Sequence, residues 1–182
     1  MICFLDMDGV LVDFSGAVEN AYGIKMDRWD FDDFIPGVTK EEFWLSCTEE
    51  FWANLPWTEE GKDILRIVEN FFGKENFFGK DNICLLTTPC LTKGSMEGKR
   101  RWIEKHLPGY LDQFLMGKPK HFCAGPQSIL IDDSDKNINK FLYYGGRAIL
   151  IPRPWNMLSY RISHPDFNLL EYLEGYLNVL KG

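Results

Sequence analysis

The sequence lacks the features that mark membrane proteins, nucleic-acid-binding proteins and secreted proteins. Its 20 Lys and Arg are outnumbered by 27 Asp and Glu, giving a formal net charge of −7. This disfavours a polyanion such as DNA as the main partner, because binding to a phosphate backbone needs a basic surface. No apolar run approaches the length that crosses a bilayer, and no charged leader precedes the first apolar residues. We therefore expect a cytoplasmic protein that binds neither nucleic acid nor a membrane.

Cysteine and histidine are too few and too scattered to form a recognisable metal or disulfide pattern. None of the five cysteines forms a C-x-x-C pair, and several lie in or beside apolar segments, so we expect reduced, mostly buried thiols. His106 and His121 have no partner at a metal-binding spacing, and Cys90 and Cys123 have no matched base. We assign no chemistry to these residues.

Short apolar runs, bounded by turn residues, recur along the chain and alternate with helical patterns. With 182 residues, 45% of them hydrophobic, the chain can bury a substantial core. This alternation predicts an α/β fold, a doubly wound parallel sheet flanked by helices. The predicted strands are Ile2–Leu5, Ile83–Leu86, Phe114–Met116, Ile129–Ile131 and Ala148–Ile151, and the predicted helices are Gly61–Phe72, Lys93–Leu107 and Asn168–Lys181.

The segment between the first two strands is long, acidic and rich in aromatic residues. A crossover between parallel strands needs only about a dozen residues, so the remaining residues predict an inserted helical cap. Within the insertion, Thr39 and Glu42 have the spacing of a capping box that begins a helix. We expect residues 1–14 and 80–182 to form the core domain and residues 15–79 to form the cap.

Two aspartates follow the first predicted strand. Asp6 and Asp8 come directly after the apolar run, and they cannot be buried without compensation, so we expect them at the carboxyl end of the strand. Ligands of open α/β sheets bind at that edge. With one residue between them, both side chains can reach the same substrate, and Gly9 allows a tight turn after them.

A second apolar strand ends in the same way, at Asp132 and Asp133. Two such strands in one sheet predict a metal site, because carboxylates that lie close together repel each other unless a cation joins them. Mg²⁺ prefers oxygen ligands and keeps several waters. We expect Asp6, Asp132 and the backbone carbonyl of Asp8 to hold Mg²⁺, with Asp133 supporting these ligands from behind.

Groups that can hold a phosphate follow two other predicted strands. Thr87 and Thr88 offer hydroxyl and backbone N–H groups at the same sheet edge. A phosphoryl-transfer site also needs cations to offset the charge of the transition state. Lys99 lies near the beginning of the next predicted helix, and Lys118 and Lys120 follow the third strand.

Together, these motifs resemble those of the 5′(3′)-deoxyribonucleotidases, a family of the haloacid dehalogenase-like phosphohydrolases. The resemblance covers nearly the whole chain, and it implies a Rossmann-like core with a small helical cap, Mg²⁺ dependence and hydrolysis of nucleoside monophosphates, with a preference for deoxyribose. The segments that carry it are Asp6–Phe14, Phe51–Trp57, Thr87–Pro89, Lys99–Lys105 and Leu130–Asp133.

The resemblance also implies roles for individual residues. Asp6 would attack phosphorus and form an aspartyl-phosphate, and Asp8 would protonate the leaving oxygen and then activate water. One departure concerns the lysine before the Asp132 strand, which in the family usually lies slightly closer to that strand than Lys120 does. Lys118 is therefore a competitor, although it is farther still. The residues implied to bind phosphate are Thr87, Thr88, Lys99 and Lys120.

Aromatic residues are expected to recognise the base, because flat π faces stack on bases without demanding one identity. The candidates are Phe14, Trp29, Phe51 and Trp52, for each of which packing within the cap is the competing interpretation. Trp155 and Asn156 follow the fifth strand and are expected near the same sheet edge.

Other functions stay open at this point. A phosphatase of the same fold could act on a sugar phosphate or another small metabolite, and a catalytically silent nucleotide-binding protein is a third interpretation, which the intact aspartates disfavour. The expected partner is a small-molecule nucleoside monophosphate, and homodimer formation is left open.

Overall fold

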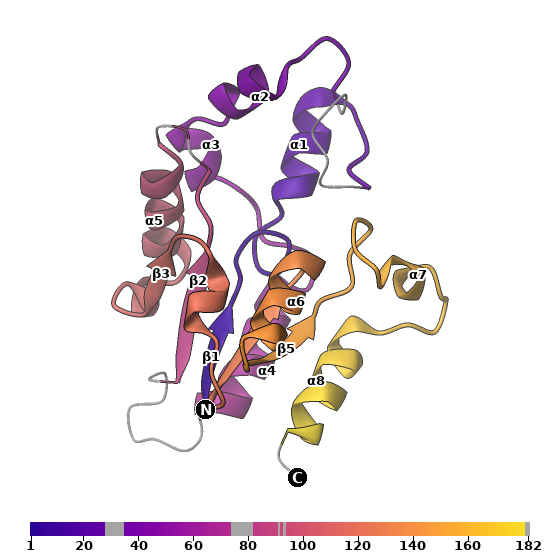
Figure 1. Cartoon of the computed structure of the whole chain (residues 1–182). Helices are drawn as coiled ribbons and strands as arrows, with labels where there is room; N and C mark the ends of the chain where they lie inside the picture. Colours follow the sequence, from indigo (N-terminus) through magenta and orange to yellow (C-terminus); the bar gives the residue numbers. More distant parts are fainter. Residues whose placement is uncertain (28–34, 74–81, 91, 93, 181–182) are drawn as a thin grey trace.

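A parallel five-stranded sheet forms the centre of the protein, which we describe from a computed structural model (Figure 1). The structure describes residues 1–27, 35–73, 82–90, 92 and 94–180. The strand order is β3-β2-β1-β4-β5, so β1 lies in the middle. The strands are β1 (Ile2–Leu5), β2 (Ile83–Thr87), β3 (Phe114–Met116), β4 (Ser128–Asp132) and β5 (Arg147–Leu150).

Side chains alternate between the two faces of the sheet, as the pleat of a strand requires. Cys3 and Leu5 belong to the larger buried cluster, whereas Phe4, between them, belongs to the smaller one. Both faces of β1 are therefore covered, which explains why its sequence is continuously apolar. The strand can be followed directly by aspartates only because it ends at the sheet edge.

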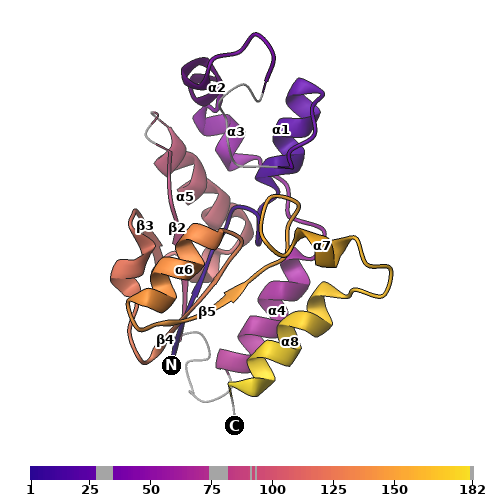
Figure 2. The ribbon, with the colours of Figure 1, turned by 45° about the vertical axis from the view of Figure 1, so that its right-hand side comes forward.

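Helices cover both faces. The larger cluster includes residues of α4 (Gly61–Phe72), α5 (Ser95–His106) and α8 (Leu169–Val179), and the smaller one includes Ile138 and Phe141 of α6 (Asp135–Tyr143). Figure 2 shows α4 and α8 side by side on one face of the sheet, and the two helices are in contact. This is the predicted α/β fold, a parallel sheet flanked by helices. Helix α6 was not among the predicted helices.

Three short helices, which we call the cap helices, lie beyond the carboxyl ends of the strands in both views (Figures 1 and 2). They are α1 (Phe14–Tyr22), α2 (Lys40–Ser46) and α3 (Glu49–Ala53). The capping box of α2 is confirmed, since the Glu42 carboxylate accepts the Thr39 N–H at 2.8 Å and the Thr39 hydroxyl accepts the Glu42 N–H at 3.2 Å.

The domain boundary at residue 79 stays a prediction. Helix α4 lies inside the predicted insertion, yet it packs against α8 and β2 rather than against the cap helices α1 and α2 in the figures. The remaining elements are the short helix α7 (Ser159–Ile162) and the 3-10 turns Pro108–Tyr110 and Lys120–Cys123. Among the described residues, no helix is both long and apolar enough to cross a membrane.

Candidate active site

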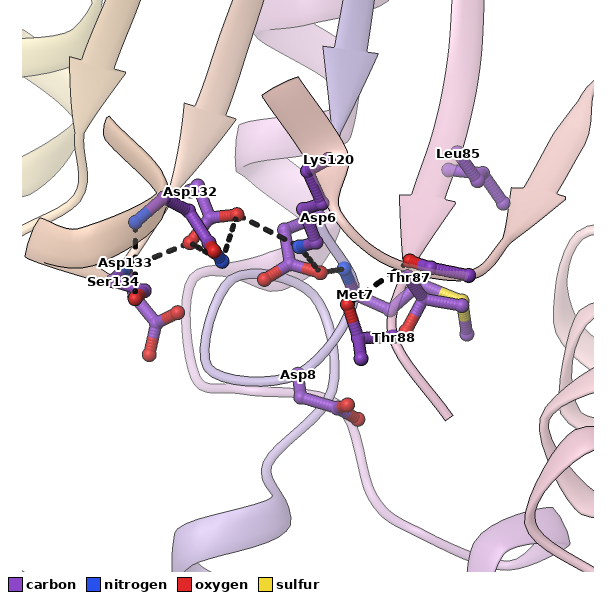
Figure 3. Close-up of polar contacts among 12 residues, drawn as sticks. Asp6, Met7, Asp8, Leu85, Thr87, Thr88, Lys120, Asp132, Asp133 and Ser134 are labelled. Carbon is purple, nitrogen blue, oxygen red and sulfur yellow. Dashed lines mark hydrogen bonds and ion pairs between the residues drawn. The ribbon is translucent and has the colours of Figure 1, made fainter. Parts of the chain in front are cut away.

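Asp6 lies immediately beyond β1, at the centre of the sheet edge (Figure 3). Its backbone N–H donates to the Ile131 carbonyl at 2.9 Å, which continues the β1–β4 ladder by one residue. One carboxylate oxygen of Asp6 accepts the Met7 N–H at 2.8 Å, and the residue is only 5% exposed. The backbone therefore holds a buried carboxylate in a defined position.

Asp132 and Asp133 stand beside Asp6 because β4 is the neighbour of β1. One oxygen atom from each of the three carboxylates lies within 4.8 Å of the other two. The Asp132 carboxylate accepts the Ser134 N–H at 2.8 Å and the Asn137 amide at 3.0 Å. Asp133 accepts the indole N–H of Trp155 at 2.6 Å. Hydrogen bonds from residues at the sheet edge thus fix the orientation of both carboxylates.

Lys120 is the cation at this cluster. Its ammonium lies 2.6 Å from the Asp6 carboxylate and 2.7 Å from that of Asp132, and the side chain is buried (Figure 3). Burial alone would lower the pKa of Lys120, but attraction to Asp132 and Asp6 outweighs it, and the pKa is raised. Lys120 therefore stays protonated. Lys118 lines the nearby cavity instead and is exposed.

The carboxylates still repel one another, although Lys120 pairs with two of them. Burial, followed by repulsion from Asp132, raises the pKa of Asp6 well above its ordinary value. The same two causes, in the same order, raise the pKa of Asp133 to about 7. One lysine thus does not balance three buried carboxylates, and a further positive charge would favour their ionised forms.

A divalent cation fits this donor set. Magnesium binds through hard oxygen ligands, and the three converging carboxylates supply them. Asp133 joins Asp6 and Asp132 in this cluster, although its predicted position was behind the ligands. The contribution of the Asp8 backbone carbonyl stays a prediction.

Asp8 belongs to a separate network. In Figure 3 its side chain points away from the Asp6, Lys120 and Asp132 contacts. One carboxylate oxygen pairs with the ammonium of Lys99, and the other is buried without a hydrogen-bond partner among the described residues. The Lys99 ammonium also donates to the Thr87 hydroxyl at 3.2 Å and lies 4.6 Å from the ring centroid of Trp52. Lys99, predicted to bind phosphate, therefore contacts Asp8.

The turn that carries Asp8 packs tightly against the β4 and β5 loops. Gly9 has φ of +74°, and a Cβ placed there would lie 2.2 Å from a carboxylate oxygen of Asp133. Only glycine avoids this collision while adopting a left-handed conformation. Arg153 donates from Nε to the Gly9 carbonyl at 2.6 Å and pairs with Glu60 at 3.3 Å. Arg153 was not identified from the sequence, because the chain distance between it and Gly9 hides this contact.

A cavity of about 960 Å³ connects the aspartates to the cap helices. Asp6, Asp8, Thr88 and Lys120 line its sheet end, and Phe14, Trp44 and Trp52 contribute an aromatic wall. Thr88 also donates to the Gly117 carbonyl at 3.2 Å. The polar residues at the sheet edge and the flat aromatic surface therefore line the same cavity.

The aromatic wall is a stack. Phe14 lies nearly parallel to Trp52 at 5.2 Å and to Trp44 at 6.1 Å between ring centroids, and Phe51 meets Phe14 edge-on. Phe14 and Trp52 are buried, whereas Trp44 is half-buried. Trp44 lines the cavity but was not among the residues predicted to contact the base.

Not all of the other predicted site residues line the cavity. Phe51 packs on Phe14 and is not among the described residues that line the cavity, and Thr87 is buried beneath Lys99. Trp29 lies outside the described residues. Asn137 contacts Asp132 but carries no motif that would have identified it, whereas Trp155 and Asn156 lie at the expected edge, where Asn156 donates to the Asp133 carbonyl at 2.9 Å.

One solved structure has a similar fold. A crystal structure of a dehalogenase matches with a TM-score of 0.53 at 13% identity, covering 96% of each chain. A HAD-family enzyme from Bacteroides thetaiotaomicron, solved with magnesium and inorganic phosphate, matches with a TM-score of 0.42 at 12% identity, covering 87% of this chain and 96% of that one. No curated protein matches the chain.

The sequence also matches a family described as 5′ nucleotidase, deoxy (pyrimidine), cytosolic type C protein, over residues 1–163. This match includes β1 to β5, the cap helices and each of the aspartates described above. It confirms the family that the motifs resembled. The chain therefore belongs to the deoxy (pyrimidine) 5′ nucleotidase family of cytosolic type C and is a 5′-nucleotidase-like phosphoric monoester hydrolase.

Proposed function

We propose that the protein hydrolyses deoxynucleoside monophosphates to a nucleoside and inorganic phosphate, with Asp6 as nucleophile and Asp8 as general acid and base. The observation that carries this proposal is that both aspartates line one cavity with a stack of aromatic side chains. A phosphate at the sheet end of the cavity would place the base against the aromatic wall.

In the first step, an oxygen of the Asp6 carboxylate forms a bond to phosphorus as the bond between phosphorus and the sugar oxygen breaks. Asp8 gives its proton to that oxygen, so a neutral nucleoside leaves. In the second step, Asp8 takes a proton from water, and the water oxygen attacks phosphorus. The bond to Asp6 breaks, phosphate is released and Asp6 is restored as a carboxylate.

Other residues hold the phosphate. Lys120 lies between Asp6 and Asp132 and would offset negative charge where it develops. Thr88 lines the same end of the cavity and can offer its backbone N–H, since its hydroxyl donates to the Gly117 carbonyl. Thr87 and Lys99 are proposed to support the phosphate site indirectly. The Thr87 hydroxyl accepts a hydrogen bond from Lys99, and Lys99 acts chiefly through its contact with Asp8.

Magnesium is the cation that we propose for the cluster of Asp6, Asp132 and Asp133, with the Asp8 carbonyl as a further ligand. When bound, it would offset the charge of the carboxylates and of the substrate phosphate. The residues that pair with these carboxylates, Lys120 and Asn137, keep them oriented in its absence.

The test is phosphate release from a panel of deoxynucleoside and ribonucleoside monophosphates and several sugar phosphates, with and without Mg²⁺. We expect Mg²⁺-dependent release that favours the deoxynucleotides. The Asp6→Asn variant should lose turnover by a factor of about 10³ or more while remaining folded, because an amide is a poor nucleophile.

The alternatives give different results. Preference for a sugar phosphate would retain the mechanism and refute the nucleotide assignment. Absence of any Asp6-dependent release would favour a nucleotide-binding protein without catalysis, and full activity of Asp6→Asn would remove Asp6 as the nucleophile.

A further inference from the structure

The turn that follows β1 is held to the rest of the molecule through its backbone carbonyls. Arg153 donates from Nε to the Gly9 carbonyl at 2.6 Å, and the Thr58 hydroxyl donates to the Val10 carbonyl at 2.8 Å. The two contacts span 144 and 48 positions of the chain. Distant parts of the chain therefore hold the turn that carries Asp8.

Arg153 is itself fixed at the carboxyl end of the sheet. Its N–H donates to the Asn156 side-chain oxygen at 3.3 Å, and the Asn156 amide donates to the carbonyls of Ile151 at 2.7 Å and Asp133 at 2.9 Å. The guanidinium also pairs with Glu60 at 3.3 Å, and the Arg153 side chain is only 12% exposed. An arginine with a fixed backbone and a covered side chain can hold the turn in place relative to the sheet.

Arg153 acts on the site from outside the cavity. It is not among the described residues that line this space, whereas Asp8 is. One carboxylate oxygen of Asp8 pairs with the Lys99 ammonium, and the other is buried without a hydrogen-bond partner among the described residues. The direction of this carboxylate therefore depends on the backbone that carries it, and that backbone continues directly into Gly9.

We infer that Arg153 is a positioning residue for Asp8. By holding the Gly9 carbonyl, Arg153 fixes the backbone one residue beyond Asp8 and keeps the carboxyl group where it can give its proton to the leaving oxygen. Proton transfer requires hydrogen-bond reach between the acid and that oxygen, so a small displacement of the turn slows it. Glu60 supports the contact by pairing with the guanidinium. This inference rests on the proposed function, in which Asp8 is the acid.

The experiment varies the leaving group, because a leaving group that is a weak base needs little help from an acid. Arg153→Met should lower kcat/KM by about 30-fold for the deoxynucleotide that the wild-type protein uses best, whose leaving sugar oxygen is strongly basic. The loss should be smaller for phenyl phosphate, and less than about twofold for para-nitrophenyl phosphate, whose leaving group is the weakest base. The quantity compared is kcat/KM, because it excludes the later attack by water.

Arg153→Lys and Arg147→Met are the controls. Lysine keeps a cation that can donate to the Gly9 carbonyl, so Arg153→Lys should lose less than Arg153→Met with the deoxynucleotide. Arg147→Met removes an exposed arginine from the other end of β5 and should leave the rates with all three substrates unchanged. The two phenyl phosphates carry no base, so a difference between them cannot arise from base binding.

Glu60→Gln provides the same test if Arg153→Met does not fold. This substitution removes the charge that pairs with Arg153, and the Glu60 side chain makes no capping hydrogen bond to α4 that would be lost with it. We expect kcat/KM to fall by about threefold for the deoxynucleotide and to stay unchanged for para-nitrophenyl phosphate. A uniform loss in Glu60→Gln, or none, would then overturn the inference.

Equal losses with all three phosphates in Arg153→Met would overturn the inference, because general damage to the site does not depend on the leaving group. Wild-type rates in this variant would also overturn it. Both results keep the proposed function, since the wild-type protein hydrolyses the deoxynucleotide. Hydrolysis of the phenyl phosphates by wild-type protein without hydrolysis of any deoxynucleotide would instead refute the proposed function, and the inference with it.

Discussion

Lys99 and Lys120 are both buried, and each pairs with a different one of the two aspartates that follow β1, Asp6 and Asp8. Lys120 bridges Asp6 and Asp132, which follow neighbouring strands. Lys99 reaches Asp8 from helix α5 and is almost fully covered by Asp8, Thr87 and Trp52. The proposed nucleophile and the proposed acid therefore have separate cations, which allows each carboxylate to be positioned on its own.

This arrangement predicts that Lys99→Met lowers kcat by about 100-fold or more while changing KM little, because Asp8 loses the group that orients it and proton transfer suffers. Steady-state kinetics and inhibition by inorganic phosphate measure the two effects. Lys105→Met, on the exposed side of the same helix, is the control. A raised KM with unchanged kcat would mean that Lys99 acts on the phosphate directly.

At the scale of the elements, the contact between α3 and α5 holds the cap to the core. Gly98 of α5 packs so closely on α3 that a Cβ there would lie 2.5 Å from the Glu49 carbonyl oxygen and 2.5 Å from the Trp52 Cβ. Arg101, one turn later, pairs with Glu49 at 2.8 Å and with Glu50. Because Trp52 and Lys99 sit at this contact, its geometry determines where the aromatic stack meets Asp8.

We therefore expect Gly98→Ala to lower the free energy of unfolding by roughly 1–3 kcal/mol, because the added methyl group collides with the backbone of α3 and outweighs the higher helix propensity of alanine. Urea denaturation measures this. Gly175→Ala is the matched control, since a Cβ at Gly175 of α8 meets nothing within 4 Å. That variant should gain up to about 1 kcal/mol. Equal stability of the two variants would show that α3 and α5 can move apart freely.

At the scale of the whole molecule, an acidic protein concentrates both signs of charge at one edge of its sheet. Asp6, Asp132 and Asp133 come together only because β1 and β4 are neighbours, and burial makes their mutual repulsion costly. A cation that binds here and relieves this repulsion stabilises the native state, and the stabilisation grows with the logarithm of the ratio of cation concentration to dissociation constant.

Magnesium should accordingly raise the melting temperature by roughly 5–10 °C at a concentration about 100 times its dissociation constant. Differential scanning calorimetry, with NaCl at matched ionic strength as the control, measures the shift. The shift should be lost in Asp132→Asn, compared with its own metal-free protein. An identical shift in that variant would place the stabilising cation elsewhere.

The sequence by itself determined the strands, the sheet class and the aspartates at the sheet edge, because each of these follows from local patterns. An apolar run that ends in Asp6 or Asp132 is typical of a buried strand that ends at the edge of a sheet, and the capping box of Thr39 and Glu42 is complete within four residues. Family motifs added Lys99 and Lys120, whose roles no periodic pattern indicates.

Only the tertiary structure decided which side chains meet. The pairing of Lys99 with Asp8, the hydrogen bond from Arg153 to Gly9 and the position of Trp44 in the cavity join residues that are far apart in the chain. Such contacts depend on strand order and on the approach of helices, which are set by packing of the whole core and leave no signal in a local stretch of sequence.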